Sequence, residues 1–174
     1  MKTSTVGILM GSDSDWPKIR AAADALNEFG ISYEAHVMSA HRTPALVEDF
    51  AKNAASRGIK VILAAAGGAA HLAGVVASHT TLPVIGIPVI TDMCGGLDSL
   101  LSTVQMPGDI PVATVAAGGG GPRNAGILAV EILALSDDNL RDKLLVFRKK
   151  LQDKILAKDQ ALQEKINTDT ANIP

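Results

Sequence analysis

The sequence predicts an α/β fold, a three-layer sandwich around a flavodoxin-like five-stranded parallel sheet, with a C-terminal helical extension. The main observation is an alternation of short aliphatic runs with longer segments whose apolar residues recur at helical spacing. The chain has 174 residues and is 47% hydrophobic, which suffices for the core of one domain. Only 3% of the residues are aromatic while 16 are glycine, so we expect small aliphatic side chains and closely approaching backbones.

Five strand–helix pairs follow one another along the chain. The runs that predict strands lie at 4–10, 31–38, 59–66, 83–87 and 111–116. The segments that predict helices lie at 16–30, 44–58, about 70–78, 96–105 and 122–135. Pro17 and Pro44 suit the first turn of a helix, and Gly30 is a stop signal. This pattern predicts the elements but leaves the order of the strands open.

A charged amphipathic segment follows the predicted sheet and its helices. We expect a helix over 136–167 and a frayed tail at 168–174. Because no repeat, low-complexity tract or long linker divides the chain, 1–135 is assigned as the α/β domain and 136–167 as a helical extension of it. The extension carries an apolar stripe, made of Leu144, Leu145, Phe147, Leu151, Ile155 and Leu162. The stripe either packs on its own domain, which we favour, or reaches onto a neighbouring subunit.

Charge and cysteine content narrow the class of protein. The formal net charge of −2 and a pI near 6.0 provide no broad positive field, which argues against nucleic acid as a partner. The single cysteine, Cys94, excludes an internal disulfide and suits a reducing compartment. The N-terminus does not read as a signal peptide, and histidines, glycines and prolines interrupt the most apolar region, 61–90. We therefore expect a cytoplasmic protein that does not bind a membrane.

Polar and glycine-rich loops follow the first three predicted strands. They read "GSDSD" at 11–15, "SAHRTP" at 39–44 and "AGGAAHLAG" at 66–74. In open α/β sheets, ligands bind at the carboxyl ends of the strands, where loops lead into helix N-termini. The three loops are therefore expected to face one crevice.

The first two loops contain groups suited to an anion and to a proton. Ser12, Ser14 and Asp15 lie where free N–H groups open a helix, which favours anion binding, although Ser14 or Asp15 could simply cap that helix. Arg42 can grip a phosphate with two donors, and a histidine such as His41 titrates near neutrality. The alternative for this last pair is plain solvation at the surface.

The third loop contains only glycine and alanine before His71, so it has no side chain larger than a methyl group there. Glycine and alanine in this stretch suit a backbone surface pressed against a planar ligand, or close packing of a helix on the sheet, and the two are compatible. His71 could be a site residue or a buried structural histidine, which the sequence does not decide.

Other candidate motifs do not support a cofactor or metal. The glycine-rich stretch at 116–126 fits no G-x-G-x-x-G/A register, and no P-loop motif occurs in the chain. The four histidines show no zinc-ligand spacing. Cys94 has no recognisable base beside it, which favours an inert thiol.

Four motifs together carry a resemblance to a known family. They read "MGSDSD", "SAHRTP", "AGGAAHLAG" and "GLDSLLSTVQMPGDIPVAT", in order between Met10 and Thr114. The sequence resembles the class I form of 5-carboxyaminoimidazole ribonucleotide mutase, also known as the catalytic subunit of phosphoribosylaminoimidazole carboxylase. The resemblance implies a cofactor-free isomerisation in purine biosynthesis, in which a carboxylate moves from an exocyclic nitrogen to ring carbon 4 through bound carbon dioxide.

The resemblance also implies roles for individual residues. His41 would be the general acid and base. The phosphate would lie against Ser12, Ser14 and Arg42 beside Gly11, and the ribose hydroxyls against Asp15. The imidazole and its carboxylate would be lined by Ser39, Ala40, Gly67, Gly68, Ala69 and Ala70, and His71 with Leu72 would complete the pocket.

The same resemblance implies a homo-octamer with sites at subunit borders, and it allows for transient contact with the ATP-dependent synthetase that makes the substrate. Two departures from the family pattern, "TDMCGG" at 91–96 and the glycine run at 118–121, concern the loop near Cys94 and an intersubunit contact. The alternatives are a carboxylase that uses free carbon dioxide and a non-catalytic nucleotide-binding module. A flavoprotein is disfavoured because the loops contain no aromatic residue except Trp16.

Overall fold

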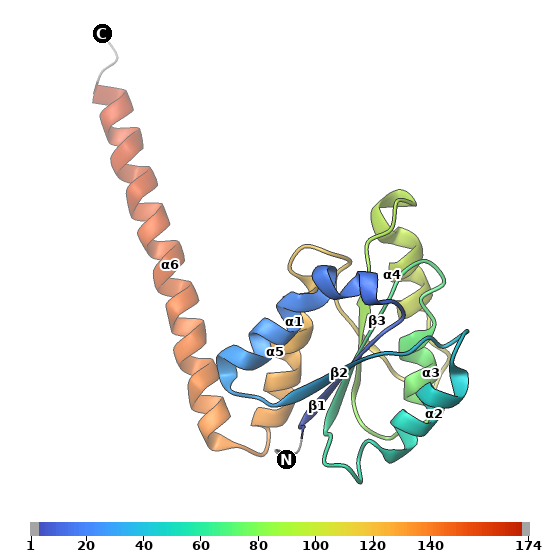
Figure 1. Cartoon of the computed structure of the whole chain (residues 1–174). Helices are drawn as coiled ribbons and strands as arrows, with labels where there is room; N and C mark the ends of the chain where they lie inside the picture. Colours follow the sequence, from blue (N-terminus) through green and yellow to red (C-terminus); the bar gives the residue numbers. More distant parts are fainter. Residues whose placement is uncertain (1–3, 172–174) are drawn as a thin grey trace. The chain divides into compact units, whose positions relative to one another are not determined.

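The computed structural model describes residues 4–171, with side chains from 4 to 169. The chain divides into two compact units, Met1–Leu133 and Ala134–Pro174, and each is described by itself. The first unit contains the parallel sheet and the helices that cover it, as predicted (Figure 1). Its strands are β1 (Val6–Met10), β2 (Tyr33–Val37), β3 (Val61–Ala66), β4 (Val84–Pro88) and β5 (Ala113–Thr114).

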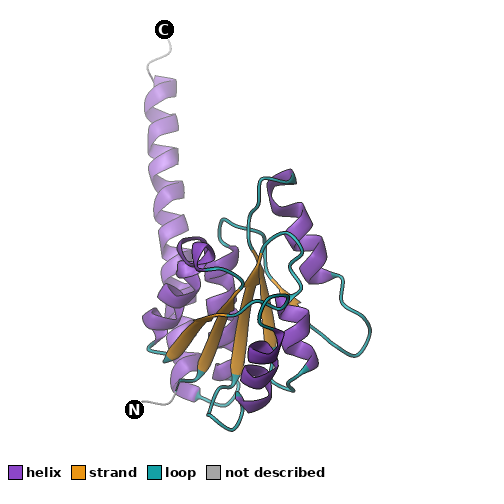
Figure 2. Ribbon diagram, turned by 45° about the vertical axis from the view of Figure 1, so that its right-hand side comes forward, coloured by secondary structure: helices purple, strands orange, loops and turns teal. Residues whose placement is uncertain are grey.

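The strand order, which the sequence left open, is β2-β1-β3-β4-β5, and every neighbouring pair is parallel. In the register of the sheet Met10 pairs with both Val37 and Ala65, so β1, β2 and β3 end at the same edge. Figure 2 shows the sheet between two layers of helices. The three-layer sandwich is therefore confirmed.

Helices α1 (Trp16–Phe29) and α5 (Gly121–Ala134) cover one face of the sheet. Helices α2 (Pro44–Asn53), α3 (Leu72–Ser78) and α4 (Leu97–Val104) lie on the other face (Figure 1). Two short 3-10 turns, η1 (Asp13–Asp15) and η2 (Cys94–Gly96), precede α1 and α4. Both turns lie in loops that follow a strand.

Small residues allow the close packing that the composition predicted. A Cβ at Gly126 would lie 2.5 Å from the backbone oxygen of Ala22, so α5 packs directly on α1. A Cβ at Gly86 would lie 2.4 Å from the Thr103 side chain, which brings α4 against β4. The central strands β1, β3 and β4 are almost entirely buried, as expected for a parallel sheet covered on both faces.

Helix α2 and strand β5 differ most in length from the ranges that the sequence predicts. Helix α2 ends at Asn53 instead of 58, because the following N–H groups of Arg57 and Gly58 turn back to Ala54 and Ala55 and Gly58 has a φ of 91°. Strand β5 lies at the sheet edge, and only its two residues Ala113 and Thr114 pair with β4. Neither change moves a residue of the three polar loops.

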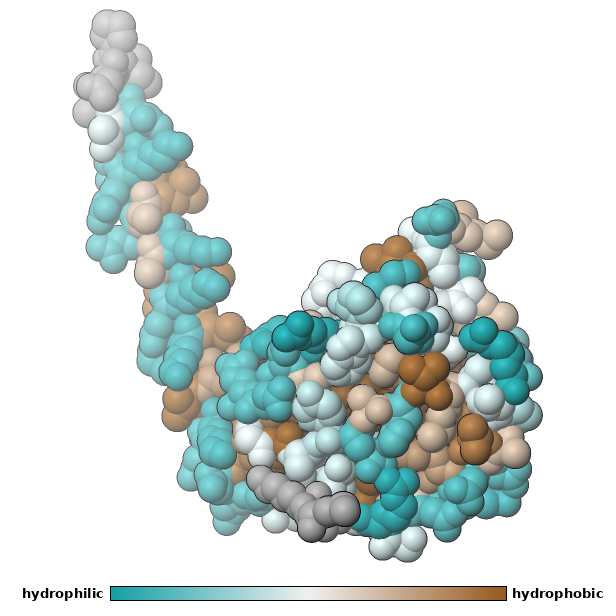
Figure 3. All heavy atoms as spheres, in the orientation of Figure 1, coloured by the Kyte–Doolittle hydropathy of each residue, from teal (hydrophilic) through white to brown (hydrophobic). Residues whose placement is uncertain are grey.

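The second unit consists mainly of one helix, α6 (Asp138–Ala171), which extends beyond the expected end at 167. Residues 172–174 of the expected tail lie outside the described residues. Figure 3 shows apolar patches between hydrophilic ones along this helix. Its exposed apolar side chains are Leu145, Val146, Leu151, Ile155, Leu156, Leu162 and Ile166. Over the described part of the chain, no helix combines the length and apolarity that a membrane span requires.

Candidate active site

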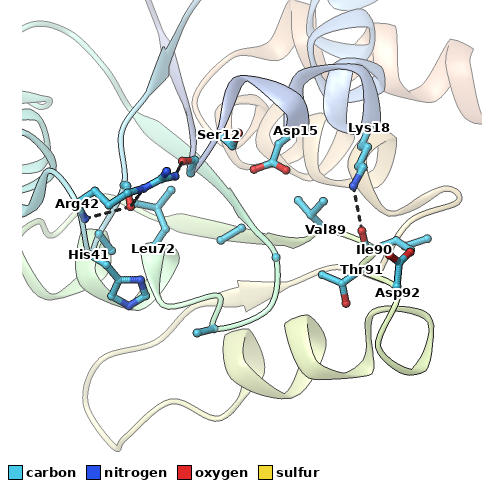
Figure 4. Close-up of a pocket in the computed structure, with 16 residues that line it drawn as sticks. Ser12, Asp15, Lys18, His41, Arg42, Leu72, Val89, Ile90, Thr91 and Asp92 are labelled. Atoms are coloured by element: carbon cyan, nitrogen blue, oxygen red, sulfur yellow. Dashed lines mark hydrogen bonds between the residues drawn. The ribbon is translucent and has the colours of Figure 1, made fainter.

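A cavity of about 650 Å³ opens at the carboxyl ends of β1 to β4. Four loops and the first turn of α1 form its walls (Figure 4). The residues that line it are Gly11, Ser12, Asp15, Lys18, Ser39, Ala40, His41, Arg42, Ala66, Gly67, Ala69, Leu72, Val89, Ile90, Thr91 and Asp92. Of the fourteen residues that the sequence proposed, ten line this cavity, while Ser14, Gly68, Ala70 and His71 do not.

The wall after β1 is shaped by Ser12. Its side chain accepts a hydrogen bond from the Ser14 N–H at 3.3 Å and lies 2.8 Å from the Ser14 hydroxyl. Ser14 thus supports Ser12 from outside the cavity. Asp15 faces the cavity, and partial burial raises the pKa of its carboxyl, although a backbone hydrogen bond from Ser12 and the Lys18 ammonium oppose this.

The wall after β2 is a loop whose two ends, Ser39 and Thr43, are joined by hydrogen bonds. The Thr43 hydroxyl donates to the Ser39 carbonyl at 3.1 Å and accepts from the Ser39 N–H at 2.9 Å. Thr43 immediately precedes α2, but its side chain makes no capping bond to that helix. Arg42 joins this loop to the first one, because its Nη2 donates to the Gly11 carbonyl at 2.8 Å.

His41 and His71 come together from separate loops. The Nε2 of His41 lies 2.9 Å from the Nδ1 of His71, and the rings meet edge to face with centroids 5.0 Å apart. His41 lines the cavity, whereas His71 lies behind it at the start of α3. Both are exposed, so His71 is not the buried structural histidine that the sequence left open. Through this bond His71 contacts the proposed acid–base residue.

The glycine-rich loop after β3 is hydrogen-bonded to a residue of α4. The Gly68 N–H donates to the Ser99 hydroxyl at 2.9 Å, and Ser99 is fully buried. Gly68 has a φ of 67°, a conformation that favours glycine. Ala70 is buried beneath the loop, which leaves Gly67 and Ala69 to face the cavity.

Sequence reasoning missed the fourth wall, formed by Val89, Ile90, Thr91 and Asp92 after β4. The Thr91 hydroxyl donates to Asp98 at 2.8 Å, and this bond lowers the pKa of the Asp98 carboxyl. Lys18 was missed as well, and its Nζ donates to the Ile90 carbonyl at 3.1 Å (Figure 4). The rule that places ligands at the carboxyl ends of parallel strands applies to β4 as much as to the others.

The described residues contain no cluster of three or more His, Cys, Asp or Glu side chains that could hold a metal ion. Arg42 and the serine hydroxyls suit a phosphate, while His41 can exchange a proton with whatever occupies the centre of the cavity. The fold and the site therefore define the class of small α/β enzymes that perform acid–base chemistry on a phosphorylated substrate.

Comparison with known proteins gives the family within this class. A family model described as AIR carboxylase matches residues 5–154, and the chain belongs to this family. It is 59% identical to the N5-carboxyaminoimidazole ribonucleotide mutase of Mycobacterium leprae over 158 residues, which cover 91% of each chain. It is 54% identical to the enzyme of the same name from Thermotoga maritima over 159 residues, 91% of this chain and 92% of the relative.

The fold is also similar to solved structures. The crystal structure of Treponema denticola PurE aligns with a TM-score of 0.82 and 32% identity, covering 90% of this chain and 97% of that one. The crystal structure of a substituted form of T. denticola PurE2 aligns with the same TM-score of 0.82 and 31% identity. The resemblance inferred from the four sequence motifs is thus confirmed at the level of the family.

Proposed function

We propose that this chain is an N5-carboxyaminoimidazole ribonucleotide mutase of purine biosynthesis. It converts 5-carboxyaminoimidazole ribonucleotide into 4-carboxy-5-aminoimidazole ribonucleotide. The names of relatives more than half identical over about nine-tenths of the chain support this activity. The observation that carries it is the position of His41, which faces one cavity together with Arg42 and the glycine-rich loop at Gly67.

The substrate phosphate is assigned to Ser12 and Arg42. The guanidinium has five N–H donors, so a bond to the Gly11 carbonyl leaves donors for a phosphate. Ser14 contributes by orienting the Ser12 hydroxyl. The Asp15 carboxylate can accept hydrogen bonds from the ribose hydroxyls, as expected from its place on the cavity wall.

The reaction requires one proton to be delivered and one to be removed. His41 protonates the carbamate nitrogen, whose bond to the carboxyl carbon breaks and releases carbon dioxide. Carbon 4 of the electron-rich imidazole then attacks the carbon dioxide, and loss of its proton to the same base restores the aromatic ring. Atoms balance without a cofactor, because the group that leaves nitrogen is the one that joins carbon.

The glycine-rich loop and the loop after β2 are suited to binding the carboxylate that is transferred from nitrogen to carbon 4. Gly67, Ala69, Ser39 and Ala40 line the cavity with backbone groups and short side chains. Such groups can hold a carboxylate or carbon dioxide without supplying a competing acid. Gly68, Ala70, His71 and Leu72 are assigned supporting roles around them.

Self-association is part of the proposal, with a homo-octamer as the expected state. Helix α4 exposes Leu97, Leu101 and Val104 to about half of their full extent, and such a group of apolar side chains favours a protein interface. The cytoplasm is the expected location, and contact with the synthetase that makes the substrate is the expected heterologous interaction. Light scattering tests the assembly: a monomer at micromolar concentration would contradict it.

The test of activity compares two substrate mixtures without ATP or added metal. Purified protein is given synthetic 5-carboxyaminoimidazole ribonucleotide at low bicarbonate, or aminoimidazole ribonucleotide with bicarbonate. Rapid conversion of the first mixture supports the mutase. The family description as a carboxylase favours direct carboxylation as the second candidate, and reaction of only the second mixture would replace the mutase by it. Binding without turnover of either mixture would identify a non-catalytic module.

A further inference from the structure

Lys18 occupies a position that helix stability does not explain. It lies in the first turn of α1, where the helix dipole favours anions and disfavours cations. Its ammonium is directed to the cavity and donates to the Ile90 carbonyl at 3.1 Å, as Figure 4 shows. The bond therefore joins the wall that carries Asp15 to the wall that follows β4.

The segment that receives this bond passes close to two glycines. A Cβ at Gly118 would lie 1.9 Å from the Cδ1 of Ile90, and one at Gly96 would lie 3.0 Å from its Cα. Gly118 thus lies against the side chain of Ile90, which is 43% exposed, and Gly96 lies against its Cα, while its carbonyl is held by Lys18. Thr91 and Asp92, the next residues along the segment, line the cavity opposite Asp15.

We propose that Lys18 is a positioning residue for the ribonucleotide, which sets the separation between Asp15 and the segment 89–92. The inference rests on the proposed function for the identity of the ligand, and on the bond to Ile90 for its geometry. Lys18 acts through Asp15 and Ile90 rather than on the reacting atoms. Its loss therefore weakens binding more than it slows the chemical step.

Charge supports the same assignment. Burial raises the pKa of Asp15, Asp13 on the same turn acts in the same direction, and the Lys18 ammonium opposes both. The other charged or titratable groups that line the cavity around Asp15 are His41, Arg42 and Asp92. Without the ammonium, Asp15 holds its proton up to a higher pH, so the carboxylate available to the ribose is lost earlier on acidification.

The first experiment needs no ligand. Hydrogen exchange is followed in the free protein for peptides that cover 89–96. The variant Lys18→Met keeps the aliphatic chain and removes the ammonium, and we expect exchange in this segment to accelerate about fivefold, as for loss of one hydrogen bond. Lys18→Arg retains a donor and should restore most of the protection. Lys60→Met, which removes an exposed lysine ahead of β3, is the matched control and should change nothing there.

The second experiment measures kinetics with 5-carboxyaminoimidazole ribonucleotide. Lys18→Met is expected to raise KM about three- to tenfold with kcat within about twofold, and to move the acid limb of kcat/KM to higher pH. Unchanged exchange in 89–96, or a fall in kcat at constant KM, would overturn the assignment of Lys18. Failure of the wild-type protein to turn over would overturn the proposed function instead, and the exchange experiment would still decide the role of Lys18.

Discussion

The Nε2 of His41 and the Nδ1 of His71 lie 2.9 Å apart, although 30 residues separate them in the chain. One proton lies between these two nitrogens, so one ring donates and the other accepts. Because the Nε2 of His41 is engaged by His71, only its Nδ1 is free to exchange a proton with the substrate. For Nε2 to reach the substrate, the His41 ring would have to turn. The pair thus links His41, the proposed proton carrier, to the loop that precedes α3.

Replacement of His41 by asparagine is expected to remove the proton carrier and keep the cavity. We expect kcat to fall by about 10² to 10⁴, the usual contribution of general acid–base catalysis. Affinity for aminoimidazole ribonucleotide, measured by calorimetry, should stay within about threefold because Arg42 and Ser12 are unchanged. A variant with normal turnover would show that His41 is not the proton carrier.

Replacement of His71 separates the hydrogen bond from the packing of the ring. His71→Phe keeps an aromatic ring and loses the Nδ1 partner of His41, and we expect kcat to fall about tenfold, as for one hydrogen bond. His71→Asn offers a polar atom near the same position and should lose less. The measurement is kcat against pH for both variants. A larger loss of kcat in His71→Asn than in His71→Phe would contradict this prediction and would indicate that ring packing, not the hydrogen bond, matters.

Ionisation of Asp15 should have opposite effects on ligand affinity and on stability. As the pH rises, ribonucleotide affinity should increase and the free energy of unfolding should decrease. Its folded pKa is raised above the ordinary value of 3.8, so the folded protein binds the proton more tightly than the unfolded chain. Between these two pKa values the free energy of unfolding falls as the pH rises, and the cost persists at neutral pH. Asp15→Asn is therefore expected to raise the melting temperature at pH 7 and to weaken ribonucleotide binding about tenfold.

The control for this prediction is the pH dependence of the variant itself. The melting temperatures of wild type and Asp15→Asn should approach each other as the pH falls from the raised folded pKa to below the ordinary value of 3.8, because only below 3.8 is the carboxyl neutral in both the folded and the unfolded wild type. The affinity of the wild type for the ribonucleotide should fall as the pH falls through the raised pKa of Asp15. The affinity of Asp15→Asn should not change over that pH range. A melting temperature of Asp15→Asn below that of the wild type at pH 7 would contradict the assignment.

Two serines of α4 provide a matched pair for stability. Ser99 accepts the Gly68 N–H, and Ser99→Ala leaves this partly buried donor without its partner, at a cost of about 1–3 kcal/mol. The buried hydroxyl of Ser102 has no hydrogen-bond partner among the residues that the structure describes, so Ser102→Ala should be neutral or stabilising. Denaturant unfolding measures both. Equal destabilisation would show that helix α4, rather than the bond to Gly68, is responsible.

Strong local signals made most of the fold predictable. These signals act over a few residues, so they can be recognised in the sequence alone. They are the aliphatic run of β1, the stop at Gly30 and the prolines in the first turns of α1 and α2. The end of α2 and the length of β5 were predicted poorly. Turns replace the helix after Asn53, and only two residues of the predicted run at 111–116 pair with β4. The pairing of β5 with β4 is a contact of the folded structure that the residue types of the segment do not encode.

The candidate site shows the same division. Ser12, His41 and Arg42 were recognisable because unusual polar residues follow apolar strands. Lys18 and Ile90 carry no such signal, since a lysine on a helix and an isoleucine after a strand are ordinary residues. Their contact at 3.1 Å across the cavity spans 72 positions of the chain.

By itself, the sequence determined the alternation of strands and helices, the polar loops at the strand ends and the four motifs that mark the family. These are properties of residue type and spacing along the chain. Only the tertiary structure decided the strand order, the meeting of His41 with His71 and the bond from Lys18 to Ile90. The physical reason is that hydrogen bonds and packing act over a few ångströms in space, and folding alone brings distant residues that close.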